Sequence, residues 1–154
     1  MRGSLTRLLL AAAVLPHEAA HALPAHLAGL DVAVTLLPEW DGPEVPLGQF
    51  NAHLDRETSL WLVRLIALAP LPTYLGVAAG LGAVLPDRSP ATVLLLPALT
   101  YWATLSGGDF AVAAHPRSAR EAGEFVAPRA SWGDRLALAL VPPNTLLVAV
   151  FLVT

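Results

Sequence analysis

The sequence predicts an all-α integral membrane protein with about four transmembrane helices, on three observations. Hydrophobic residues make up 55% of the chain and charged residues only 14%, whereas soluble domains carry about 25% charged residues. The mean hydropathy is +0.59. Several apolar stretches approach the roughly 20 residues that a membrane-spanning helix needs. We therefore expect the 154 residues to form one multi-pass domain, 1–154, in the cell membrane.

The expected spans cover about residues 5–30, 59–85, 91–112 and 136–154. The first follows Arg2 and Arg7 and could be taken for a signal peptide. Signal peptides have short apolar cores that are cut away, but this stretch continues into histidine and glutamate side chains that could carry out chemistry. Prolines such as Pro16 and Pro97 fall inside the expected spans, where they free backbone carbonyls that need other partners. This pattern favours a bundle with an internal polar cavity.

A polar segment with acidic side chains separates the first two spans. Residues 31–37 contain β-branched side chains in partial alternation, and a second short run covers residues 45–50. A turn-like sequence, Trp40-Asp41-Gly42-Pro43, lies between them. These features predict a small β-hairpin at the membrane surface, although Pro43 and Pro46 weaken its second strand.

Composition also limits the chemistry of the chain. There is no cysteine, so any metal must be bound by His, Asp or Glu side chains, a donor set that suits catalytic zinc. The net charge of −3 and the absence of a basic stripe argue against nucleic-acid binding. The expected partners are the lipid bilayer and a membrane-protein or peptide substrate; the oligomeric state stays open.

The first apolar stretch contains an HExxH motif, formed by His17, Glu18, Ala19, Ala20 and His21. On a helix the two histidines lie on one face, one turn apart. They can share a zinc ion, with Glu18 beside them as the general base. Ionisable groups inside an apolar span are costly and indicate function. The alternative is that the motif lies at the membrane surface, solvated and without a role.

A catalytic zinc usually takes a third protein ligand. Asp109 is the favoured candidate, because a carboxylate at the end of the third apolar stretch needs a partner and Gly107 and Gly108 permit close backbone approach. The alternative is that these glycines simply end the helix and leave Asp109 in a wet loop. His26 is ranked lower, because nine residues beyond His17 it falls on the opposite face of a continuous helix.

The HEAAH motif and the later Gly-Asp step resemble the site-2 protease-like family of intramembrane zinc metalloproteases. They are also similar in pattern to the short zincin peptidases of the DUF3267 type. The resemblance implies that His17, His21 and Asp109 bind Zn²⁺ and that Glu18 activates water. The implied activity is hydrolysis of peptide bonds at or within the membrane.

One feature departs from that family. Site-2 proteases typically carry an Asn-Pro ahead of a Leu-Asp-Gly motif, whereas this chain has Ser-Gly-Gly-Asp at residues 106–109. The source of oxyanion stabilisation is therefore open. Asn144 could supply it, although an interhelical hydrogen bond is the simpler role for a span asparagine.

The competing function is a non-catalytic membrane metal-binding or accessory protein derived from such a protease. It would be marked by a missing third ligand or an obstructed water site. A transporter or channel is disfavoured because no inverted repeat is visible. The four tryptophans (Trp40, Trp61, Trp102 and Trp132) are expected to be interface anchors, and Trp102 could instead line a cavity near Asp109.

Overall fold

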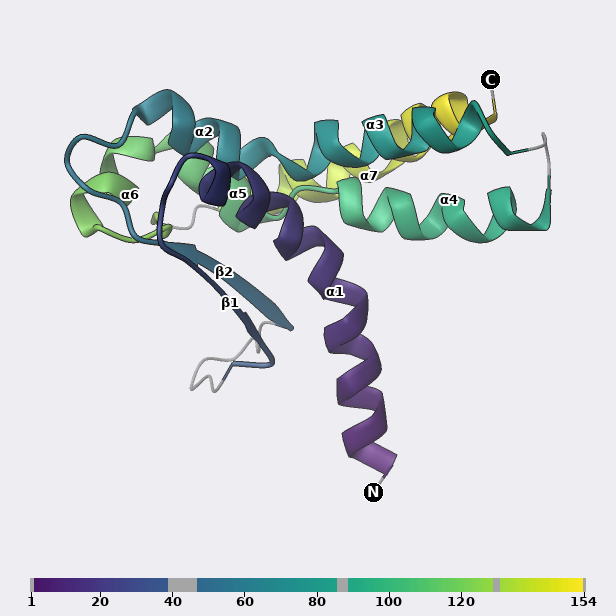
Figure 1. Ribbon diagram of the computed structural model, residues 1–154, viewed down its shortest axis with the longest axis horizontal. Helices are drawn as coiled ribbons and strands as arrows, with labels where there is room; N and C mark the ends of the chain where they lie inside the picture. The colour runs from purple at the N-terminus through teal and green to yellow at the C-terminus, as the bar shows by residue number, and fades with distance from the viewer. Residues whose placement is uncertain (1, 39–46, 86–88, 129–130, 154) are drawn as a thin grey trace.

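The protein is mostly helical in a computed structural model that describes residues 2–38, 47–85, 89–128 and 131–153. These residues form seven helices and one two-stranded antiparallel sheet (Figure 1). The elements are α1 (Arg2–Leu27), β1 (Val32–Leu36), β2 (Gly48–Ala52), α2 (Leu60–Leu68), α3 (Pro70–Gly82), α4 (Pro90–Ala103), α5 (Gly107–Ala114), α6 (Pro116–Ala122) and α7 (Ser131–Val153).

Helices α3, α4 and α7 lie side by side along the longest axis of the molecule (Figure 1). Helices α2, α5 and α6 gather at one end of this layer, and the hairpin packs near them against α1. Helix α1 crosses the layer obliquely, and its N-terminal half extends away from the other helices (Figure 1). The leucines of that half are exposed, including Leu5, Leu8 and Leu9. An uncovered apolar surface of this kind suits lipid as its solvent.

Two helices are long and apolar enough to cross a membrane, over Leu8–Leu27 and Trp132–Leu152. Helices α2 and α3 together pass the same test, but they meet at a bend of 50°. Helix α4 has 14 residues, or about 21 Å at 1.5 Å per residue, which is short of the roughly 30 Å hydrocarbon core. The described residues therefore contain two candidate spans, or three if the bent pair counts as one.

The two middle stretches of the sequence differ from the continuous helices that we expected. The second is bent where α3 begins at Pro70, since proline lacks the N–H that would continue the preceding helix. The third is divided, because Thr104 leaves helical geometry (φ −76°, ψ 120°) and Ser106 caps a new helix, α5. Side-chain capping and proline thus override the continuous hydropathy of these stretches.

The predicted hairpin is confirmed. Strands β1 and β2 pair antiparallel, with Val34 opposite Phe50 at the centre of the register. The second strand begins at Gly48 and runs to Ala52, so it is displaced from the expected run at 45–50. The expected turn at residues 40–43, together with Trp40, Val45 and Pro46, lies outside the described residues.

Two buried apolar clusters surround the middle of the molecule. The first joins the end of α1 to the hairpin, α2, α5 and α6 and contains Phe50, Ile66 and Phe125. The second joins α1 to α3, α4 and α7 and contains Tyr74 and Leu99. Helix α1 contributes to both clusters, so its HExxH segment lies between them.

The expectation for the tryptophans is met unevenly. Trp61 and Trp132 are exposed on α2 and α7, as membrane-interface anchors would be. Trp102 is half-buried, and its indole N–H donates to the Ala13 carbonyl 2.7 Å away on α1. Trp102 therefore ties α4 to α1.

Candidate metal centre

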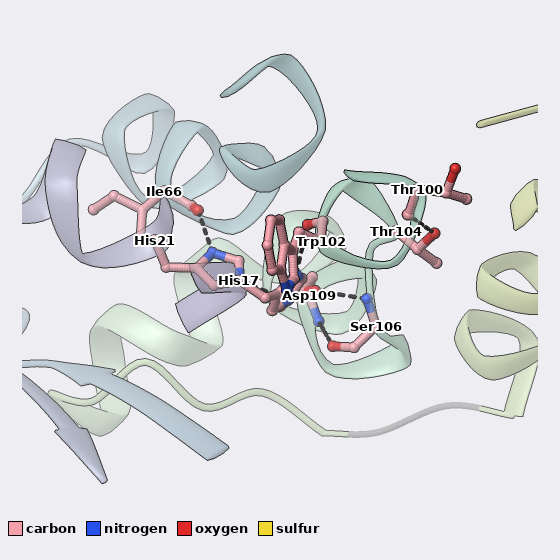
Figure 2. A network of polar contacts seen from close by, with 8 residues as sticks. All are labelled: His17, His21, Ile66, Thr100, Trp102, Thr104, Ser106 and Asp109. Carbon is pink, nitrogen blue, oxygen red and sulfur yellow. Dashed lines mark hydrogen bonds and ion pairs between the residues drawn. The ribbon is translucent and has the colours of Figure 1, made fainter. Parts of the chain in front are cut away.

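The two histidines of the motif face one another on α1. Their Nε2 atoms are 3.3 Å apart, and each Nδ1 lies at a backbone carbonyl of another helix. His17 Nδ1 is 3.0 Å from the carbonyl oxygen of Trp102 on α4, and His21 Nδ1 is 2.7 Å from that of Ile66 on α2. Figure 2 shows this network. Each ring is thus held at its Nδ1 atom by a backbone carbonyl and presents its Nε2 atom to the other ring.

These contacts assign the protons of the two rings. A carbonyl oxygen only accepts hydrogen bonds, so each Nδ1 carries the proton and donates it. In the neutral rings, each Nε2 then presents a lone pair to the other. Metal-ligating histidines typically donate their second N–H to a carbonyl in this way, which fixes both tautomer and orientation. The motif therefore has the arrangement of two metal ligands.

Asp109 reaches the same point from α5. It is the third residue of that helix and forms a capping box with Ser106. The Ser106 N–H donates to Asp109 Oδ2 at 2.6 Å, and the Asp109 N–H donates to the Ser106 hydroxyl oxygen at 3.1 Å. Asp109 is 8% exposed. The glycines before it begin a helix, so Asp109 is not in the wet loop considered above.

Close helix packing holds α5 in place. A Cβ atom added to Gly107 would lie 1.9 Å from Oδ1 of Asp134 on α7. A Cβ added to Gly133 would lie 3.0 Å from the Gly107 carbonyl oxygen. Glycine is therefore needed at this crossing of α5 and α7, which sets the position of the Asp109 backbone.

The three side chains converge. His17 Nε2 is 3.5 Å from Asp109 Oδ2, and His21 Nε2 is 3.2 Å from Asp109 Oδ1. One donor atom from each residue lies within 4.8 Å of the others. Tetrahedral zinc with bonds of about 2.0–2.1 Å separates its ligand atoms by about 3.3 Å, close to the spacings observed. In the described parts of the chain, this is the one group of three or more such side chains that could hold a metal ion.

Glu18 lies beside the triad on the wall of a cavity of about 670 Å³. It is 9% exposed and packs against β2 at Gly48. A Cβ atom added to Gly48 would lie 2.6 Å from Val14 Cγ1 and 3.0 Å from Glu18 Cγ. The absence of a side chain at Gly48 therefore allows α1 and β2 to approach closely and gives Glu18 its place.

The charge of the cavity favours a cation. Glu18 and Asp109 are the acidic side chains of its lining, and none of the lining residues is an arginine; the chain contains no lysine. Buried carboxylates are costly unless they are paired or bind a metal. The Asp109 carboxylate and two neutral imidazoles, with the Glu18 carboxylate beside them, therefore suit a divalent cation such as zinc.

The remaining lining is largely apolar. The apolar side chains that line it include Val14, Phe50, Val112, Phe125, Leu138 and Val141, from α1, β2, α5, α7 and the segment after α6. His21 stacks on Phe50, with ring centroids 5.6 Å apart. A ligand in this cavity would meet apolar walls on the sides away from the triad.

The other two residues considered from the sequence lie elsewhere. His26 is exposed near the end of α1 and is not part of the triad. Asn144 is buried on α7 but is not among the residues that line the cavity. Neither is placed to act at the triad.

Several supporting residues were not predicted. The carbonyls of Ile66 and Trp102 had no recognisable signal, because any residue could supply a backbone oxygen. Ser106 had one, since a serine three residues before an acidic side chain is a capping-box pattern. Gly48 could not be identified, because its role depends on how the hairpin packs against α1.

Comparisons with protein-family models, with curated protein sequences and with solved structures found no match to this chain.

Proposed function

We propose that the chain is a multi-pass zinc metalloprotease of the cell membrane, of the site-2 protease-like kind, that hydrolyses peptide bonds at or within the bilayer. The observation that carries the proposal is the convergence of His17, His21 and Asp109 beside Glu18 on one cavity. In this proposal the two imidazoles and the Asp109 carboxylate hold the zinc ion. When bound, zinc would supply a Lewis acid and would lower the pKa of a coordinated water.

Glu18 is the general base of the proposed reaction. It follows His17 directly, lines the cavity and is not one of the three metal-binding side chains. A carboxylate in this position takes a proton from the attacking water and returns it to the leaving amine. Its contact with Gly48 restrains the carboxylate on the cavity wall.

The hairpin suggests how a substrate is held. The N–H of His53 and the carbonyl of Leu47 hydrogen-bond to residues that flank β1. Because backbone groups alternate in direction along a strand, those of Gly48 and Phe50 point to the opposite edge of β2. That edge borders the cavity. An extended peptide could add there as a strand, with apolar side chains against the cavity walls.

The proposal also contains a four-span arrangement. The two candidate spans, the bent pair α2–α3 and the shorter α4 would together make four crossings. Because α1 is one of the candidate spans and carries the motif, the site would lie within the thickness of the bilayer. A substrate would then be a membrane-embedded or membrane-proximal peptide segment.

The third ligand and the cavity help to distinguish a protease from a non-catalytic metal-binding protein. A non-catalytic metal-binding protein was expected to lack a third ligand or to have an obstructed water site. Asp109 lies within reach of both histidines, and a cavity of about 670 Å³ adjoins Glu18. Both observations favour the enzyme over its non-catalytic alternative.

The test is zinc quantification on the full chain purified in detergent. We expect one zinc per wild-type chain, and a large loss in His17→Ala and in Asp109→Asn. His26→Ala is the matched control, because this exposed histidine of the same helix should leave zinc binding unchanged. A wild-type protein without stoichiometric zinc would end the proposal, and full affinity in Asp109→Asn would show that the ligand set is wrong.

Catalysis is tested separately with Glu18→Gln. This variant should keep its zinc but cleave β-casein about 10²–10⁴-fold more slowly, the usual contribution of a general base. If wild type and Glu18→Gln bind zinc equally and neither cleaves casein or membrane-embedded peptides, the metal site would stand and the protease function would not.

A further inference from the structure

Peptide hydrolysis at this site needs a hydrogen-bond donor in addition to a base. Negative charge develops on the carbonyl oxygen as water adds, and positioned donors commonly stabilise it. Asn144 does not line the cavity, so another group is needed as the donor. The inference below rests on the proposed function and concerns a different residue of the same site.

Four polar side chains line the cavity besides the triad and Glu18: Gln49, Tyr101, Thr104 and Ser106. Two of them are already engaged. The Thr104 hydroxyl donates to the Thr100 carbonyl at 2.8 Å, and the Ser106 hydroxyl oxygen accepts from the Asp109 N–H in the capping box. Within the described residues, Tyr101 and Gln49 have no side-chain hydrogen bond, whereas the Ser106 hydroxyl keeps its proton but is held in the cap beside Asp109.

Tyr101 is the better placed of the two. It directly precedes Trp102, whose carbonyl oxygen lies 3.0 Å from His17 Nδ1, so its backbone adjoins the histidine half of the triad. Glu18 lines the same cavity. At 51% exposure, its side chain also has room to move towards a bound ligand.

Tyr101 and Gln49 also differ in the secondary-structure elements that carry them. Tyr101 stands on α4, which is tied to α1 by the Trp102 indole. Gln49 stands on a two-stranded sheet, and small sheets of this kind are marginally stable alone. Sites built on packed helices hold their geometry more accurately. The helix-borne hydroxyl is therefore the preferred donor.

We propose that Tyr101 is a catalytic residue whose hydroxyl donates a hydrogen bond to the carbonyl oxygen of the scissile peptide as negative charge forms there. Water oxygen bonds to the carbonyl carbon while Glu18 takes a proton from the water. The π electron pair of the C=O bond moves to the carbonyl oxygen, which Tyr101 stabilises. An electron pair of that oxygen then re-forms the C=O bond as the C–N bond breaks. The electron pair of the C–N bond goes to nitrogen, and Glu18 returns the proton to that nitrogen.

The test uses binding rather than turnover. The zinc-loaded full chain in detergent is titrated with two probes: a phosphinic pseudo-tripeptide, which imitates the tetrahedral state, and acetohydroxamate, which reports on the metal alone. Tyr101→Phe removes only the hydroxyl. Gln49→Met removes the amide donor and is the matched control.

We expect Tyr101→Phe to bind the phosphinic peptide about 10²-fold more weakly, since loss of one such donor typically costs 10²–10³. Its zinc content and its acetohydroxamate affinity should match those of wild type, and Gln49→Met should bind both probes normally. Equal phosphinate affinity in wild type and Tyr101→Phe overturns the inference while the proposed protease stands. A loss confined to Gln49→Met reassigns the donor and also overturns it.

A different pattern identifies failure of the proposed function itself. If the wild type binds neither zinc nor acetohydroxamate, the metal site is wrong and the role of Tyr101 falls with it. If it binds both but not the phosphinic peptide, the cavity does not accommodate a tetrahedral peptide, which likewise excludes Tyr101 as its donor.

Discussion

The two halves of the metal centre are held in different ways. On the histidine half, the rings of His17 and His21 are oriented by carbonyls 85 and 45 residues away in sequence. On the aspartate half, Asp109 is oriented by Ser106, three residues away. The Asp109 side chain is therefore oriented by local helix capping, whereas the two histidine rings are oriented only when α1, α2 and α4 are packed together.

This difference predicts separate responses to mutation. Changes at the interfaces of α1 should disturb the histidines together with the global fold. Changes in the capping box should disturb Asp109 with a small and local loss of stability.

Metal removal should have the largest effect, because it affects both halves at once. Zinc at about 100 times its dissociation constant should stabilise the folded protein by about 2.7 kcal/mol. Thermal melting in detergent, with and without zinc after chelator treatment, measures this shift. Asp109→Asn should reduce the shift sharply, and an unchanged shift in that variant would show that the metal binds elsewhere.

Gly48→Ala should disturb the packing of α1 against β2. The added methyl group would lie 2.6 Å from Val14 Cγ1 and 3.0 Å from Glu18 Cγ, and overpacking of this kind costs about 1–3 kcal/mol. We expect a lower melting temperature and slower peptide hydrolysis. Gly76→Ala is the control, since a Cβ there meets nothing within 4 Å; if both variants behave alike, the contact does not position Glu18.

Trp102→Phe tests the support of the histidine half. It removes the indole N–H that donates to the Ala13 carbonyl, a loss of about 1 kcal/mol for a typical hydrogen bond. Because the Trp102 carbonyl orients His17, zinc affinity should also fall about tenfold, as for other residues that orient metal ligands. Trp61→Phe, on an exposed tryptophan, should leave zinc affinity unchanged; equal zinc affinity in Trp102→Phe and wild type would contradict the prediction.

Ser106→Ala tests the aspartate half. Loss of this cap should cost about 1 kcal/mol and weaken zinc binding several-fold, because Asp109 loses one of its two restraints. Ser89→Ala is a matched control, since Ser89 caps α4 through Thr92 in the same way. Both variants should lose similar stability in thermal melting, and only Ser106→Ala should lose zinc affinity in a competition titration.

Much of the fold could be predicted from the sequence, with errors of a particular kind. The four apolar stretches appear as helices and the hairpin is present, because apolar run length and β-branched alternation are local properties. The bend at Pro70 and the break before Ser106 were not predicted. Both result from backbone hydrogen bonding and capping, to which a measure of average hydropathy is insensitive.

The residues of the candidate site were likewise only partly predictable from the sequence. His17, Glu18 and His21 form a motif that any reader of the sequence can find, and Asp109 was identified because a carboxylate in an apolar stretch needs a partner. Gly48 and Tyr101 were not identified. Their places depend on which side of the hairpin meets α1 and which face of α4 borders the cavity, and neither follows from residue spacing.

Local sequence is enough to establish the apolar character of the chain, the one-turn spacing of the two histidines and the capping pattern at Ser106 and Asp109. Each depends on residues within a few positions of one another. The tertiary structure alone decided that these pieces meet, with imidazoles and carboxylate 3.2–3.5 Å apart. These contacts join residues about 90 positions apart in the sequence. They form because the burial of two apolar clusters against α1 packs α2, α4 and α5 around the HExxH motif.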